Sequence, residues 1–175
     1  MKRRFNFIAI FVMAFAVLLL SGCGEKRTEL KFEGEEGTIV FNVKEKAGYK
    51  ISTNKDDLRT TREQGVLIGD GFKIGIEFND DFGYFFDSDF DKIKEARKDY
   101  DDYKEVTYSK LNGVQYFYGS YNSYEIMLPC GDSKDYFLTL SVYGAKDTEE
   151  AAKTAIQNEE LLDVLNNITV IKAAK

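Results

Sequence analysis

Acidic side chains gather in one segment of this 175-residue chain, NDDFGYFFDSDFD at positions 79–91. Carboxylate oxygens are ligands that Ca²⁺ prefers in proteins. A 12-residue helix–loop–helix calcium loop needs glycine at position six and glutamate at position twelve. Counted from Asp87, those positions hold Lys92 and Lys98, which excludes that loop. The segment predicts either a solvated loop before a helix, with acids at the positive end of the helix dipole, or a looser cation site formed by Asp80, Asp81, Asp87 and Asp89.

A second segment, YFYGSYNSYE at positions 116–125, is rich in tyrosine. Rigid amphipathic tyrosines spaced by small residues are typical of binding surfaces, here for a glycan or a peptide. The alternative is that alternate rings fill the core of a sheet and only a few are exposed. The candidate binding surface consists of Tyr116, Tyr118, Tyr121 and Tyr124.

The chain contains no histidine, and this excludes Ser-His-Asp and Cys-His nucleophile arrangements and most zinc sites. It also has no glycine-rich phosphate loop. Catalysis would depend on carboxylates, tyrosines or a lysine. A carboxylate-based hydrolase needs two acids about 5 to 9.5 Å apart in a cleft, for which a small domain with short loops has little room. We therefore favour a non-catalytic protein with no catalytic residue, resident metal or cofactor.

The N-terminus has the parts of a secretory signal. Basic residues at positions 2–4 precede an uncharged apolar stretch at 7–20. A span of about 30 Å of hydrocarbon needs roughly 20 apolar residues, so this stretch is short for a transmembrane helix and typical of a signal peptide. It ends in Leu20-Ser21-Gly22-Cys23.

That tetrapeptide resembles the lipobox of bacterial lipoproteins. The resemblance implies that the Cys23 sulfur carries a covalent diacylglyceryl lipid and that the chain is cut between Gly22 and Cys23. Two acyl chains give stable membrane retention. We therefore expect a removed signal peptide at 1–22, a lipidated tether at 23–28, and one domain at 29–175 on the extracytoplasmic face of the cell membrane. An ordinary signal that ends in a chance cysteine is the alternative.

Charge limits the partners of the mature chain. Its net charge falls from −6 to −9 on loss of residues 1–22, which hold three basic and no acidic residues. An acidic surface repels nucleic acid and anionic lipid, so the lipid itself would supply the membrane attachment. The other cysteine, Cys130, is expected to be a small buried side chain; the alternative is a reactive thiol.

Apolar and polar residues alternate over much of the domain, which predicts an antiparallel sheet. Gly75 within one such stretch predicts a bulge or a close approach of another group. Asn112-Gly113 predicts a turn. The strands are expected around 30–32, 39–43, 49–51, 66–68, 72–78, 106–108, 114–118, 124–128 and 136–143.

Two stretches have helical spacing. Phe90, Ile93, Ala96, Tyr100 and Tyr103 predict one central amphipathic helix that packs on the sheet. A second helix, from residue 147, is expected to break at Gln157-Asn158, where its apolar residues change face, and a final apolar segment follows at 168–170. The fold class is therefore α+β, with a mostly antiparallel sheet, the central helix and a broken C-terminal helix.

The order of these elements and the segment NGVQYFYG at 112–119 resemble the PsbP-like fold. Members of that class are mostly non-catalytic accessory or binding proteins, so the resemblance implies binding. The expected function is a lipid-anchored binding or accessory module of the bacterial cell envelope that contacts an envelope protein or a glycan. The alternatives are a small hydrolase of envelope polymers and a solute-binding accessory of a transporter.

Overall fold

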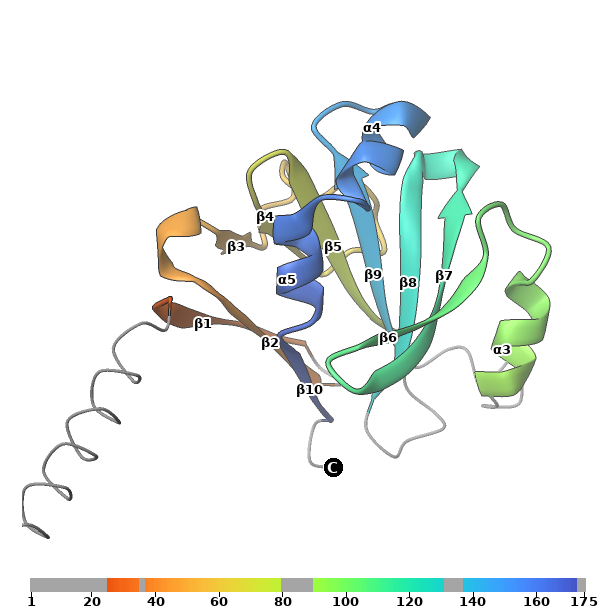
Figure 1. The fold of residues 1–175 in the computed structure, drawn as a ribbon, viewed down its shortest axis with the longest axis horizontal. Coiled ribbons are helices and arrows are strands. Elements are labelled where there is room, and N and C mark those ends of the chain that lie inside the picture. The colour runs from red at the N-terminus through yellow and green to blue at the C-terminus, as the bar shows by residue number, and fades with distance from the viewer. Residues whose placement is uncertain (1–24, 35–36, 80–89, 131–136, 173–175) are drawn as a thin grey trace, which may run out of the picture.

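The structure, a computed structural model, describes residues 25–34, 37–79, 90–130 and 137–172, which form two antiparallel sheets and three α-helices (Figure 1). The expected α+β class with mostly antiparallel pairing is confirmed. None of the helices in these ranges is long and apolar enough to cross a membrane. The first strand begins at Arg27, two residues before the predicted start of the domain. The elements are β1 (Arg27–Glu33), β2 (Gly37–Lys44), β3 (Lys50–Ser52), β4 (Gly65–Ile68), β5 (Phe72–Asn79), α3 (Phe90–Arg97), β6 (Lys104–Tyr108), β7 (Leu111–Tyr118), β8 (Ser123–Pro129), β9 (Phe137–Gly144), α4 (Glu149–Ala155), α5 (Glu159–Leu165) and β10 (Ile168–Lys172).

The smaller sheet has the strand order β1-β2-β10, so the last strand of the fold pairs with the second. Alternation along β2 buries Ile39, Phe41 and Val43. Phe32 of β1 stacks on Phe78 of the larger sheet, with ring centroids 6.3 Å apart. The two sheets therefore share one apolar core.

The larger sheet has the order β3-β4-β5-β9-β8-β7-β6, and its two faces differ. One face carries the main core and is covered by α4, α5 and the smaller sheet. Cys130 is fully buried in this core, as expected. The other face of the sheet carries the polar members of β5, β8 and β9, among them Glu77, Glu125, Thr139 and Ser141, and all four are buried.

The helix α3 lies on that second face, apart from α4 and α5 (Figure 1). Ile93 is fully buried among Val114, Tyr116, Met127 and Phe137. The prediction that this helix continues to Tyr103 is wrong, because α3 ends at Arg97.

Beyond Arg97, successive turns with hydrogen bonds between residues three apart carry the chain onward, for example from Tyr100 N to Arg97 O at 3.0 Å. Such turns repeat at about the same spacing as a helix, so Tyr100 and Tyr103 still reach the same cluster.

The predicted turn at Asn112-Gly113 is also wrong. The β6–β7 hairpin turns at Ser109 and Lys110, whose φ angles are +49° and +73°. Gly113 instead lies inside β7, where a Cβ would fall 2.2 Å from the Met127 carbonyl oxygen. The close approach of two strands, not a turn, requires the glycine.

The C-terminal helix is broken where predicted. The Thr148 hydroxyl accepts from Ala151 N and caps α4, and the Asn158 side chain accepts from Glu160 N at 2.8 Å and Leu161 N at 3.3 Å. An N-terminal cap supplies acceptors for backbone N–H groups that have no partner inside the helix. Because Asn158 caps a new helix, Leu161, Val164 and Leu165 can all face the core.

Candidate functional site

Strand alternation separates the four tyrosines of the candidate binding surface. Tyr116 and Tyr118 of β7 lie on the polar face of the larger sheet, and Tyr121 follows in a short 3₁₀ turn beside Tyr118. Tyr124 of β8 lies on the opposite face, packed on Phe117 with ring centroids 5.4 Å apart. Its hydroxyl donates to Asp102 Oδ2 at 2.5 Å, and it is only 4% exposed. Tyr124 therefore belongs to the core side, and the other three tyrosines form a group.

Tyr100 completes that group from beyond the end of α3. The ring centroids of Tyr100 lie 4.8 Å from Tyr116 and 5.9 Å from Tyr118, and Tyr118 lies 5.3 Å from Tyr121. We call these four residues the tyrosine ladder. Offset and tilted ring pairs at such distances are mutually favourable. Tyr116 is buried at 5% exposed, and Tyr100, Tyr118 and Tyr121 are half-buried, so only these three can meet a partner at the surface.

Arginines pack on both ends of the tyrosine ladder. The Arg97 guanidinium carbon lies 5.2 Å from the Tyr100 ring centre and 5.6 Å from that of Tyr116. The Arg62 guanidinium carbon lies 5.5 Å from the centre of Tyr121. Arginine favours aromatic faces because the ring quadrupole attracts the cation. A stacked guanidinium keeps its N–H groups in its own plane, where they can bind an acceptor.

A cavity of 140 Å³ lies between these groups. Its walls consist of the two arginines, three tyrosines of the tyrosine ladder, and polar and apolar side chains of β8 and β9. We call it the arginine–tyrosine cavity. It is lined by Arg62, Arg97, Tyr100, Tyr116, Tyr118, Glu125, Met127 and Thr139.

Glu125 is the buried acid of the cavity, 3% exposed. Its two carboxyl oxygens accept from Ser123 Oγ at 3.0 Å and Ser141 Oγ at 2.9 Å. Burial raises the pKa of the Glu125 carboxyl, and hydrogen bonds from the two serines partly oppose this shift. Desolvation disfavours the charged form of a carboxyl. The cavity therefore contains two permanent cations and one acid whose ionisation is disfavoured.

A second buried acid lies farther along the same face. Glu63, 5% exposed, accepts from the Tyr143 hydroxyl and from Arg59 N at 2.7 Å. The Arg59 guanidinium stacks over the Tyr143 ring at 4.5 Å and pairs with Asp147. Gly75 of β5 leaves room for the Glu63 side chain, so the close approach expected at Gly75 is confirmed. The pairing of β5 with β9 continues through Gly75 without a bulge. Every charged group named in this cluster has a partner within it.

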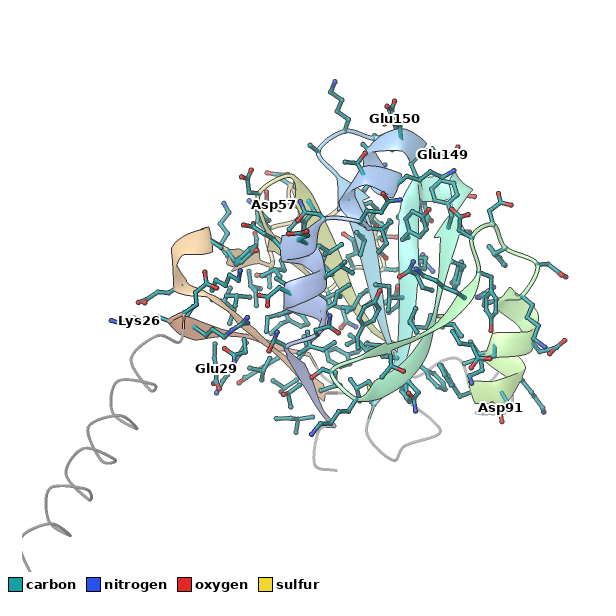
Figure 2. The ribbon with its side chains drawn as sticks, viewed as in Figure 1. Lys26, Glu29, Asp57, Asp91, Glu149 and Glu150 are labelled. Carbon is teal, nitrogen blue, oxygen red and sulfur yellow. The ribbon has the colours of Figure 1, made fainter. Side chains whose placement is uncertain are left out.

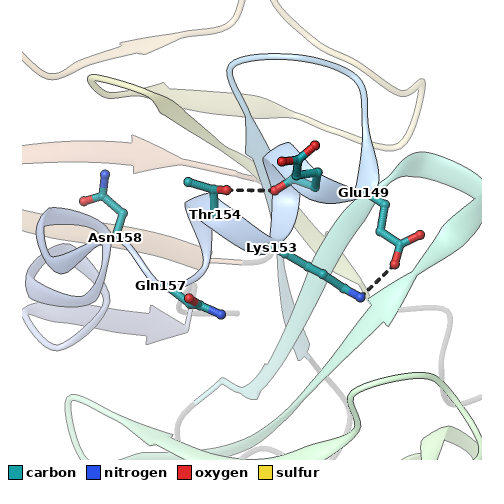
Figure 3. Close-up of a pocket in the computed structure, with 6 residues that line it drawn as sticks. Glu149, Lys153, Thr154, Gln157 and Asn158 are labelled. Atoms are coloured by element: carbon teal, nitrogen blue, oxygen red, sulfur yellow. Dashed lines mark hydrogen bonds and ion pairs between the residues drawn. The ribbon is translucent and has the colours of Figure 1, made fainter.

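One larger hollow at the surface is explained by local structure. A hollow of 710 Å³ at the break between α4 and α5 is lined by side chains of that one segment (Figure 3). Lys153 pairs with Glu149 at 2.7 Å, Thr154 Oγ1 donates to the Glu150 carbonyl at 2.9 Å, and Asn158 caps α5. These groups stabilise the helices themselves.

Most of the acids labelled in Figure 2 lie on the outside of the molecule. Figure 2 shows Glu29, Asp91, Glu149 and Glu150 pointing away from the body of the domain, as does Lys26. Within the described ranges, no three His, Cys, Asp or Glu side chains are placed to hold a metal ion. The lipid-anchor residue Cys23 and the acids Asp80, Asp81, Asp87 and Asp89 lie outside the described residues.

Sequence reasoning missed Arg62, Arg97 and Glu125. Glu125 alternates with apolar residues along β8, and Thr139 and Ser141 do so along β9, a pattern that also fits a solvated strand face. The available signal was a carboxylate between Tyr124 and Ile126, in a strand whose only other polar residue is Ser123. No family model, no curated protein and no solved structure matches this chain.

Proposed function

We propose that this chain is a lipid-anchored, extracytoplasmic binding module of the bacterial cell envelope, with no catalytic role. The single observation that supports the anchor is the sequence Leu20-Ser21-Gly22-Cys23 after a short apolar run. In this proposal Cys23 carries a diacylglyceryl lipid and the membrane is reached through it. A PsbP-like arrangement of the α+β domain is part of the same proposal.

The arginine–tyrosine cavity supports the binding role. Ligand sites are concave and combine aromatic walls with a few convergent polar groups. Here Arg62, Arg97 and Glu125 come from three separate segments and line one cavity beside the tyrosine ladder. An envelope protein or a glycan that presents a polar group could bind there.

The anchor is tested by the intact mass of the chain extracted from membranes. We expect the wild type to lack residues 1–22 and to carry lipid, and we expect Cys23→Ala to carry none. Cys130→Ala is the matched control, because Cys130 is buried and should leave lipidation unchanged. An unlipidated wild-type mass would overturn the proposed anchor.

A carboxylate-based hydrolase of envelope polymers is the second candidate, and Glu125 is the observation that favours it. A buried acid with a raised pKa is what a general acid requires. A glycosidase would also need a second carboxyl about 5 to 9.5 Å away across the substrate. Release of soluble fragments from purified cell wall, abolished by Glu125→Gln, would favour this candidate; no release would remove it.

A further inference from the structure

We infer that the arginine–tyrosine cavity binds a small oxyanion, the carboxylate, phosphate or sulfate group of a solute or partner, between the guanidinium groups of Arg62 and Arg97. The inference rests on the proposed binding role and names the chemistry of its ligand. It does not depend on the lipid anchor.

The charge of the cavity walls supports an anionic ligand. Arg62 Nε lies 3.9 Å from Glu77 Oε2, a distant pairing at a side chain that is 48% exposed. Arg97 pairs with no carboxylate among the described residues. The two cations therefore outweigh the acid that shares their cavity, because burial disfavours the ionised form of Glu125.

The hydrogen bonds of Arg97 point to the same chemistry. Its Nη1 donates to the Tyr100 hydroxyl at 3.2 Å. Its Nε is buried and makes no hydrogen bond within the part of the chain that the structure describes. A buried donor without an acceptor is costly, so such groups are rare in folded proteins. An oxyanion in the cavity supplies acceptors for the terminal N–H groups of the guanidinium, in the geometry that this group matches best, whereas Nε is reached only if its neighbours shift.

The carboxyl of Glu125 is not that acceptor. Its oxygens accept from the hydroxyl groups of Ser123 and Ser141, and neither oxygen accepts a hydrogen bond from Arg97 Nε. Stacking on Tyr100 and Tyr116 holds the Arg97 guanidinium in place, so little side-chain freedom is lost when an anion binds.

The size of the cavity restricts the ligand. Since a water molecule occupies about 30 Å³ of liquid, 140 Å³ holds a group of roughly four or five non-hydrogen atoms. Acetate, inorganic phosphate and sulfate are of this size. The tyrosine ladder extends from the cavity to Tyr121, where a larger ligand could continue over aromatic rings.

Isothermal titration of the full chain in non-ionic detergent tests the inference, with acetate, phosphate and sulfate as separate probes. Sodium chloride keeps the ionic strength constant, so non-specific screening is excluded. We expect saturable binding of at least one probe, and the comparison of the three shows which oxyanion the cavity prefers.

Four variants assign the binding to the cavity. Arg97→Gln and Arg62→Gln should each weaken it by about 10-fold or more, since each removes charge-assisted hydrogen bonds. Glu125→Gln should strengthen it at high pH and change it little at low pH, because the substitution removes a negative charge only where Glu125 is ionised. Arg59→Gln is the matched control: Arg59 also stacks on a tyrosine but does not line this cavity, so binding should be unchanged.

Two results would overturn the inference: no saturable binding of any probe, or equal affinity in wild type, Arg97→Gln and Arg62→Gln. Circular dichroism checks that the variants fold. If Arg97→Gln does not fold, Arg62→Gln still tests the inference, because the Arg62 side chain is half-exposed. A lipidated chain that binds no oxyanion would support the proposed anchor and overturn the oxyanion site. An unlipidated chain whose oxyanion binding is lost in Arg97→Gln would overturn the anchor and support the oxyanion site.

Discussion

Replacement of Gly75 by alanine should destabilise the fold strongly, although alanine is usually the better residue inside a strand. A Cβ at position 75 would fall 2.4 Å from Glu63 Oε1 and 2.6 Å from Glu63 Cδ. The far end of a glutamate side chain can normally move aside at little cost. Here it cannot, because Glu63 is 5% exposed and accepts hydrogen bonds from the Tyr143 hydroxyl and Arg59 N.

The size of the effect follows from these two hydrogen bonds. A hydrogen bond to a charged group contributes about 1.5–3 kcal/mol, so loss of both costs about 3–6 kcal/mol. Removal of a mid-strand glycine returns about 0.5–1 kcal/mol. The expected net loss is about 2–5 kcal/mol, a large part of the about 5–15 kcal/mol by which domains are stable.

Urea unfolding followed by far-UV circular dichroism measures the free energy of unfolding of four chains: wild type, Gly75→Ala, Glu63→Ala and the double variant. In the Glu63→Ala background the added methyl group has room, so Gly75→Ala should be neutral or stabilise by about 0.5–1 kcal/mol. Gly119→Ala is the control, because a Cβ there would meet only Phe117 at 3.8 Å. Equal losses from Gly75→Ala in both backgrounds would refute the reasoning.

Three further outcomes are expected. Glu125→Gln should gain stability relative to wild type as pH rises, because burial raises the folded-state pKa of Glu125. In the wild type, the stabilising contribution of Glu125 is complete below its unfolded-state pKa and is lost as pH rises through its folded-state pKa, whereas glutamine does not titrate. Urea unfolding at several pH values checks this, and a pH-independent difference would contradict it. Asn158→Ala should cost about 1 kcal/mol by removing the cap of α5, seen as a lower urea midpoint; an unchanged midpoint would show that the cap adds nothing. Ser109→Asn with Lys110→Gly should stabilise by about 1 kcal/mol, since both positions have positive φ angles; a lower thermal midpoint would refute this reading of the turn.

Local pattern was sufficient to predict most of the fold. Alternation placed the hairpins of β1–β2 and β4–β5, and the change of apolar face at Asn158 located the break between α4 and α5. In these cases the local preference and the tertiary contacts favour the same structure.

The two errors in the predicted elements have different causes, a tertiary contact in one and an ambiguous local pattern in the other. Asn112-Gly113 is a strong turn signal, but the pairing of β7 with β8 needs Gly113 as a strand residue. Helical spacing past Arg97 was equally compatible with successive turns.

The cavity could not be predicted because its residues are distant in sequence. Arg62 precedes β4, Arg97 ends α3, and Glu125 lies in β8. A polar face of a strand has the same periodicity whether water or another segment covers it. Only the tertiary structure shows that the segment around Arg59 to Glu63 and α3 lie over that face and bury its acids.

The pairing of β10 with β2 joins the two ends of the domain and sets the order in which it can be completed. Ile168 lies opposite Phe41 in this pairing, so β2 lacks one of its two neighbouring strands until residues 168–172 have been synthesised. Contacts between such distant segments form slowly because a long loop must close first. A nascent chain would thus keep its N-terminal strands unpaired on one edge while the ribosome is still at work. In the proposed export through a translocation channel, which requires an unfolded chain, this delay would keep the domain open until β10 is made.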